Sequence, residues 1–129
     1  MFTVEQIKAA HAKVKSGADF PAYIKEIKGL GLIRYEFMVA DGTIDYYGAG
    51  NYKVSAPAIY PARPISNNAQ PMLLKKNIEE HQQGQSDFLT FCQLAADAGV
   101  QKWVVDTQTM LCIYYNLDGN EMIAEPIPQ

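Results

Sequence analysis

The feature that most constrains the fold is a repetition of the chain along itself. Shifting the sequence by 68 residues places Asp19-Phe20 on Asp87-Phe88, Gly31 on Gly99, and Tyr46-Tyr47 on Tyr114-Tyr115. These matches fall at predicted helix caps, turns and aromatic core positions, where a repeated unit needs the same kind of side chain. The sequence therefore predicts two internal repeats, residues 1–57 and 71–126, within one domain that covers residues 1–129.

Each repeat begins with two predicted helices. Thr3 followed three residues later by Gln6 fits a capping box, which predicts the start of the first helix. A second apolar stripe at helical spacing covers residues 20–30 behind a predicted cap at Asp19. Two further helices are predicted between Pro71 and residue 99.

A three-stranded meander is predicted after each helix pair. Apolar residues alternate with polar ones over residues 32–39, which is typical of a strand with one buried face. Asp41-Gly42 is typical of a type I′ hairpin turn. The fold class is therefore α+β, with two pseudo-symmetric ααβββ repeats in one compact domain. The repeats either share one antiparallel sheet or pack face to face.

A proline-rich connection, residues 58–70, separates the two repeats. Residues 57–71 hold four of the seven prolines, with Asn67-Asn68 between them, so this stretch is predicted to be irregular and partly extended.

Charge and hydropathy exclude several classes of function. The chain has 14 acidic and 11 basic side chains, which leaves no basic surface for binding nucleic acid. No apolar run approaches about 18 residues and no leader stands at the amino terminus, so we expect a cytoplasmic protein that contacts no membrane. No metal-binding spacing and no acyl-transfer motif occurs, so no metal, cofactor or catalytic residue is expected.

The two cysteines are predicted to be core residues. At the 68-residue offset Cys92 falls on Ile24 and Cys112 falls on Ile44. A free cysteine behaves as a small apolar side chain in such a position. This pattern favours buried thiols over a nucleophile or a disulfide.

Neighbouring tyrosines are predicted to point to opposite faces of the sheet. Tyr46 and Tyr114 continue the apolar alternation into the core, so the tyrosine that follows each of them lies on the other face with charged side chains. Tyrosine offers a large contact area and a hydrogen-bonding tip, which favours a recognition surface. The predicted binding residues are Tyr47, Tyr115, Lys102 and Asp106. The alternatives are an ordinary solvated sheet face, a face covered by the proline-rich connection and, for Asp106, a cap of the hairpin turn.

His11 and His81 form a second candidate site. Each lies on the apolar stripe of the first helix of its repeat. One interpretation is a neutral, hydrogen-bonded histidine at the edge of the core. The other is a polar pair lining a cleft between the repeats, suited to proton transfer or metal ligation.

Several strings carry a resemblance to a known family. These are HQQG at residues 81–84, DFLTFC at 87–92 and GVQKWVVD at 99–106, together with the opening MFTVEQIKAAH. With them the chain resembles the YbcV-like family of small bacterial and prophage proteins, which is loosely labelled "phage envelope protein". That family has no known function, so the resemblance implies a bacterial or prophage origin and no activity, cofactor or catalytic residue.

We expect the protein to be a noncatalytic binding or adaptor module with a protein or small-molecule partner. The sequence leaves open whether it forms a homodimer. The alternative is a small enzyme or small-molecule receptor with a cleft between the two repeats. A deep pocket containing both histidines would favour the alternative, whereas a flat tyrosine-bearing face would favour the module.

Overall fold

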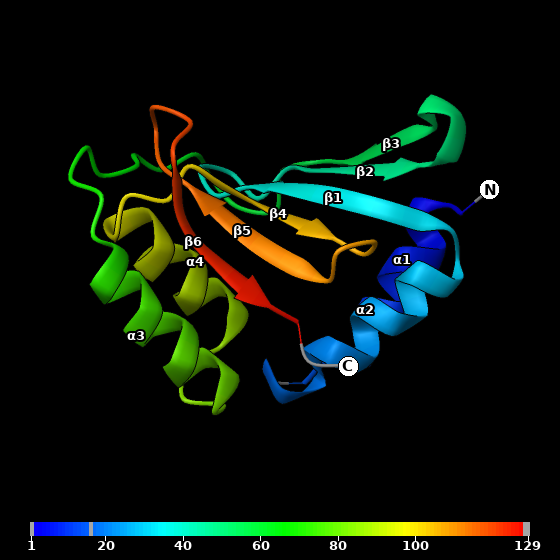
Figure 1. Ribbon diagram of the computed structural model, residues 1–129, viewed down its shortest axis with the longest axis horizontal. Coiled ribbons are helices and arrows are strands. Elements are labelled where there is room, and N and C mark those ends of the chain that lie inside the picture. The colour runs from blue at the N-terminus through cyan, green and yellow to red at the C-terminus, as the bar shows by residue number, and fades with distance from the viewer. Residues whose placement is uncertain (1, 16, 128–129) are drawn as a thin grey trace.

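The computed structural model describes residues 2–15 and 17–127, and it places α-helices on one face of an antiparallel β-sheet (Figure 1). The helices are α1 (Val4–His11), α2 (Phe20–Gly29), α3 (Pro71–Gln82) and α4 (Phe88–Asp97), with short 3-10 turns at Gly17–Asp19 and Ala49–Asn51. The strands are β1 (Leu32–Met38), β2 (Ile44–Gly48), β3 (Lys53–Ala56), β4 (Lys102–Asp106), β5 (Leu111–Tyr115) and β6 (Glu121–Pro126). The predicted α+β class is confirmed.

The two meanders form a single sheet. Its strand order is β3-β2-β1-β4-β5-β6, so the first strand of each meander pairs with the other at the centre. Glu36 on β1 lies opposite Val104 on β4, its counterpart at the 68-residue offset. This pairing resolves the choice that the sequence left open, whereas the pseudo-symmetry of the two repeats stays a prediction.

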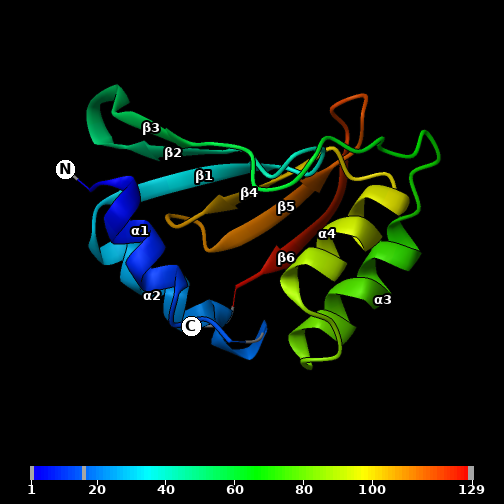
Figure 2. The same cartoon turned by 180° about the vertical axis from the view of Figure 1, so that it is seen from behind.

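The helices cover the sheet in two separate pairs. α1 and α2 lie under one end of the sheet, and α3 and α4 lie under the other end (Figure 2). None of these helices is long and apolar enough to cross a membrane, as far as residues 2–15 and 17–127 go.

The predicted phase of the strands is confirmed. Tyr46 and Tyr114 face the helices and are only 5% and 7% exposed, while Tyr47 and Tyr115 are half-buried on the outer face. The sheet therefore has an inner face that belongs to the core and an outer face that is free of helices.

Both cysteines are buried free thiols, as predicted. Burial raises the pKa of the Cys92 thiol to about 11 and that of the Cys112 thiol to about 12. Since the thiolate is the reactive form, both side chains are poor nucleophiles at neutral pH.

Side-chain caps are present at the starts of α1 and α4. The Thr3 hydroxyl accepts a hydrogen bond from the Gln6 N–H at 3.2 Å, and the Gln6 side chain accepts one from the Thr3 N–H at 2.8 Å. Asp87 caps α4 by accepting from the Thr90 N–H at 2.7 Å. Asp19 stands at the start of α2, but its carboxylate accepts from the Lys15 N–H instead of capping the helix.

The predicted type I′ turn at Asp41-Gly42 is wrong. A type I′ turn needs positive φ at both central residues, and only Gly42 has it, at +77°. The connection instead spans five residues, in which the Asp41 carboxylate accepts from the Thr43 N–H at 3.0 Å. Tertiary packing explains the difference, because Ile59 and Tyr60 lie against this loop and the Tyr60 hydroxyl donates to the Val39 carbonyl at 2.6 Å.

The proline-rich connection is irregular, as predicted, and it is held by backbone hydrogen bonds at both ends. The Arg63 N–H donates to the Ala40 carbonyl in the β1–β2 loop. The Ser66 and Gln70 N–H groups donate to the carbonyls of Ala96 and Ala98 at the end of α4. The connection therefore ties the first hairpin to the second helix pair.

Candidate functional site

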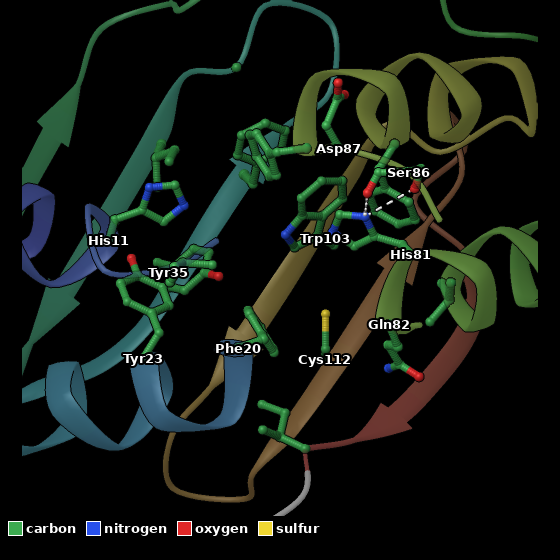
Figure 3. Close-up of a pocket in the computed structure, with 18 of the residues that line it drawn as sticks. His11, Phe20, Tyr23, Tyr35, His81, Gln82, Ser86, Asp87, Trp103 and Cys112 are labelled. Atoms are coloured by element: carbon green, nitrogen blue, oxygen red, sulfur yellow. Dashed lines mark hydrogen bonds between the residues drawn. The ribbon is translucent and has the colours of Figure 1, made fainter. Parts of the chain in front are cut away.

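A cavity of about 570 Å³ lies between the two helix pairs, with the inner face of the sheet as its floor (Figure 3). Side chains of α1 and α2 form one wall, and side chains of α3, α4 and the loop between them form the other. The volume falls within the range of about 300–1,000 Å³ that is usual for small-molecule sites.

The lining of the cavity is mainly aromatic. Nine of the 14 Phe, Tyr and Trp residues contribute to it: Phe20, Tyr23, Tyr35, Phe37, Tyr46, Phe88, Phe91, Trp103 and Tyr114. Phe37 and Trp103 stack at 4.3 Å between ring centroids, and Phe88 stands edge-on to both of them. The cavity therefore offers ring faces and ring edges, the two surfaces against which another aromatic ring packs best.

His11 lies at the rim of the cavity as the last residue of α1. Its ring stands edge-on to the rings of Tyr23 and Phe88, at centroid distances of 5.3 Å and 6.0 Å. Because Tyr23 belongs to α2 and Phe88 to α4, His11 connects the two helix pairs. Desolvation by these neighbours lowers the pKa of His11 below its ordinary value.

His81 lies on α3, in the opposite wall. Its ring stacks on Phe91 with a centroid distance of 4.6 Å, and its Nδ1 lies 2.9 Å from the Ser86 carbonyl oxygen and 3.1 Å from the Ser86 hydroxyl. Burial lowers the pKa of His81, although the Ser86 carbonyl and the nearby Asp87 carboxylate act in the other direction. The ring is thus held on one face and at one nitrogen.

Tyrosine hydroxyls supply further polar groups. Tyr23 and Tyr46 are 7% and 5% exposed, and in the part of the chain that the structure describes no hydrogen bond is made by either hydroxyl. Burial raises the pKa of Tyr46 to about 12 and raises those of Tyr23, Tyr35 and Tyr114 as well. All four phenols are therefore neutral at physiological pH.

The structure places His11 and His81 in the same cavity, but in opposite walls. Figure 3 shows the two rings on either side of the space, with Trp103 beside His81 and Tyr23 beside His11. No hydrogen bond or ring contact joins the two histidines. Within residues 2–15 and 17–127, no group of three or more His, Cys, Asp or Glu side chains could hold a metal ion.

The predicted outer-face residues lie on the opposite side of the sheet and interact mainly with their own neighbours. The Arg34 guanidinium lies 4.0 Å from the centroid of the Tyr47 ring, and Lys102 Nζ lies 3.2 Å from Glu36 Oε1. The Asp106 carboxylate accepts from the N–H groups of Gln108 and Thr109, so it caps the β4–β5 turn.

The two outer-face tyrosines do not form one cluster. Tyr47 on β2 is three strands away from Tyr115 on β5, which is about 14 Å across the strands at the usual spacing, and the two residues are also offset along the strand direction. Lys102 pairs with Tyr115, whereas Arg34 lies between Tyr47 and Asp106 across the sheet. The four predicted residues are thus spread over two separate parts of the face.

Sequence reasoning assigned Tyr46 and Tyr114 to the core and did not predict that they line a cavity. Phe88, which bridges the two helix pairs, was identified only as part of the repeat. The available signal was the concentration of large aromatic side chains on the inner face of both meanders. Such a surface does not by itself show whether facing helices fill the space.

Stability is expected to fall on mild acidification because of the two histidines. Both have a pKa lowered from 6.5 in the folded state, so the unfolded chain binds more protons as the pH drops below 6.5. The urea midpoint should therefore be lower at pH 5.5 than at pH 7.5. Asp41 and Asp87 have carboxyl pKa values lowered from 3.8, so their contribution is lost only at more acidic pH.

The control for this prediction is the double variant His11→Phe/His81→Phe, which keeps a ring at each position. Its urea midpoint should change less between pH 7.5 and pH 5.5 than that of the wild type. An unchanged pH dependence in the double variant would show that other groups are responsible.

Comparison with known proteins adds one match. A family model described as "Protein of unknown function (DUF1398)" matches residues 8–126. No curated protein matches the chain. The matched range includes all six strands and every helix except the first turn of α1, so it covers both walls and the floor of the cavity.

Proposed function

The chain belongs to the DUF1398 family of proteins of unknown function, and we propose that it is a noncatalytic receptor for a small, uncharged, largely aromatic molecule. The observation that carries this proposal is the cavity of about 570 Å³ between the helix pairs, with its nine aromatic residues. Ligand sites of this kind combine an apolar lining with a few polar groups that orient the ligand. His81 and the Tyr23 and Tyr46 hydroxyls are such groups.

The protonation states of the lining favour an uncharged ligand. Lowered pKa values keep both histidines neutral at physiological pH, and raised values do the same for the buried tyrosines and for Cys112. The charged side chains that border the cavity are Lys8, Lys15, Asp87 and Glu125. They carry both signs, and all except Glu125 are exposed. A charged ligand would therefore lose its hydration without gaining a buried partner.

The cavity supports this proposal better than the outer face of the sheet supports a docking surface. On the outer face the Glu36 carboxylate forms ion pairs with both Arg34 and Lys102. These charged side chains therefore already have partners within the sheet. In the cavity, by contrast, Tyr23 and Tyr46 are 7% and 5% exposed, and their hydroxyls make no hydrogen bond within the described ranges. These hydroxyls are free to pair with a polar group of a ligand.

The direct test uses the neutral fluorophore N-phenyl-1-naphthylamine, whose emission rises in an apolar site. We expect saturable binding to the wild type. The variant Cys112→Phe should weaken this binding at least tenfold, because Cys112 lies on the cavity floor and a phenyl ring there occupies the ligand's space (Figure 3).

The matched control is Ile113→Phe. Ile113 is the next residue of β5, its side chain lies on the outer face, and it is half-buried. This variant should bind the fluorophore as the wild type does. Wild-type affinity in Cys112→Phe, with native circular dichroism, would show that the fluorophore binds elsewhere and would contradict the proposal.

We further infer that the chain is a YbcV-like member of the family, of bacterial or prophage origin, and that it acts in the cytoplasm. The strings at residues 81–84, 87–92 and 99–106 support the first point. The two buried free cysteines fit a reducing compartment. Fractionation of the native host tests the location, and recovery of the protein from a membrane or envelope fraction would contradict it.

A further inference from the structure

We propose that the molecule bound in this cavity is a planar aromatic compound with a hydroxyl or N–H group that donates a hydrogen bond to Nε2 of His81. This inference rests on the proposed function and names the chemical class of the ligand.

The first step is the tautomer of His81. Its Nδ1 lies 2.9 Å from the carbonyl oxygen of Ser86, and a carbonyl oxygen can only accept a hydrogen bond. The proton of the neutral ring is therefore on Nδ1. Nε2 is left with its lone pair, so this atom can only accept.

The second step is the fixed orientation of the ring. His81 stacks on Phe91 at an interplanar angle of 20°, and the contact with Ser86 holds it in the plane of that stack. Ser86 in turn precedes Asp87, the N-cap of α4. The imidazole is thus anchored to the start of a helix, so Nε2 keeps a constant position.

The third step is that Nε2 lacks a partner. His81 lines the cavity, and inside residues 2–15 and 17–127 no hydrogen bond is made by its Nε2. A half-buried acceptor at an apolar cavity gains most from a ligand that brings a donor. A site of this kind discriminates strongly against an analogue that lacks the donor, because the acceptor is then left unpaired.

The fourth step is the shape of the surroundings. Phe91, on which His81 stacks, also contacts Trp103 at 5.6 Å, and Trp103 stacks on Phe37. The space beside His81 is therefore bordered by aromatic rings, and Trp103 lies next to His81 in Figure 3. A flat ring that carries its donor in the ring plane can stack on these side chains and reach Nε2 at the same time.

The experiment compares 2-naphthol with 2-methoxynaphthalene, in which a methyl group replaces the proton of the hydroxyl donor, by displacement of N-phenyl-1-naphthylamine at pH 7.5. The wild type should bind 2-naphthol at least tenfold more tightly. His81→Phe, which keeps a ring stacked on Phe91, should bind both compounds with similar affinity. His11→Phe is the matched control, and it should keep the wild-type preference because His11 lies in the opposite wall.

A second measurement does not depend on any variant. The side-chain ¹⁵N resonances of His81 report which nitrogen carries the proton and which one accepts a hydrogen bond. In the wild type, 2-naphthol should shift the Nε2 resonance, and 2-methoxynaphthalene should leave it nearly unchanged.

The outcomes separate the two proposals. Equal affinity of the wild type for both naphthalenes would overturn the present inference and leave the receptor function intact. A preference that persists in His81→Phe would also overturn it, since the acceptor would then be another group. If neither naphthalene nor the fluorophore binds to the wild type, the receptor function itself is wrong.

Discussion

Replacing Tyr114 by alanine should lower the free energy of unfolding by about 3 kcal/mol, whereas Tyr115→Ala should cost less than about 1 kcal/mol. The two residues are neighbours on β5 and carry the same side chain, but they point to opposite faces of the sheet. Tyr114 is 7% exposed and its ring lies 5.7 Å from that of Trp103. Tyr115 is half-buried, with Lys102 Nζ 5.6 Å from its ring centroid.

The physical reason for the large effect at position 114 is the cavity beside it. Tyr114 already borders an open space of about 570 Å³, so its removal enlarges a void that the surrounding side chains do not fill. Urea denaturation of the two variants measures the difference. Comparable losses of stability in Tyr114→Ala and Tyr115→Ala would contradict the division into an inner and an outer face.

Gly99→Ala should be a second strongly destabilising change, and it has a control inside the same chain. A Cβ atom at Gly99 would lie 2.7 Å from the Ala69 Cα and 3.1 Å from the Ala69 nitrogen, both of them backbone atoms. The residue also has a φ of +93°, which alanine rarely adopts. We therefore expect a loss of about 3–5 kcal/mol, because the connection at residues 68–69 would have to move.

The control is Gly31→Ala, at the position that the 68-residue offset aligns with Gly99. Gly31 has a similar φ of +103°, but nothing lies within 4 Å of a Cβ atom there. This variant should lose only about 1–2 kcal/mol, the cost of the backbone conformation alone. The difference between the two urea midpoints therefore reports how much stability is lost because a Cβ atom at Gly99 clashes with the backbone of the connection. Equal losses would show that the connection does not pack tightly at Gly99.

If the aromatic cavity is the functional site, its sensitivity to substitution should differ from that of the core around it. Cys112→Phe and His81→Phe keep or add volume at the cavity and open no new void, so these changes should alter binding more than stability. Cys92 is fully buried and does not border the cavity, so changes there should act through stability. This separation allows binding defects to be distinguished from folding defects.

The local structure of the chain and the faces of its strands follow from the order of neighbouring residues. The capping box at Thr3, the start of α4 at Asp87 and the phase of Tyr46 and Tyr114 depend only on neighbours a few residues away. The burial of both cysteines followed from the 68-residue offset, which places each of them on an isoleucine. Such features need no knowledge of the tertiary structure, because they are set by helical and strand periodicity.

How these elements meet, and therefore where the candidate site lies, depends on contacts between residues that are far apart in the chain. The turn at Asp41-Gly42 departs from its local preference because Ile59 and Tyr60 pack against it. Only the pairing of β1 with β4 joins the meanders into one sheet and separates Tyr47 from Tyr115. The cavity exists because the two helix pairs lie apart from each other on the inner face of that sheet. An empty volume is a property of the distances between elements, and periodicity along the chain carries no information about those distances.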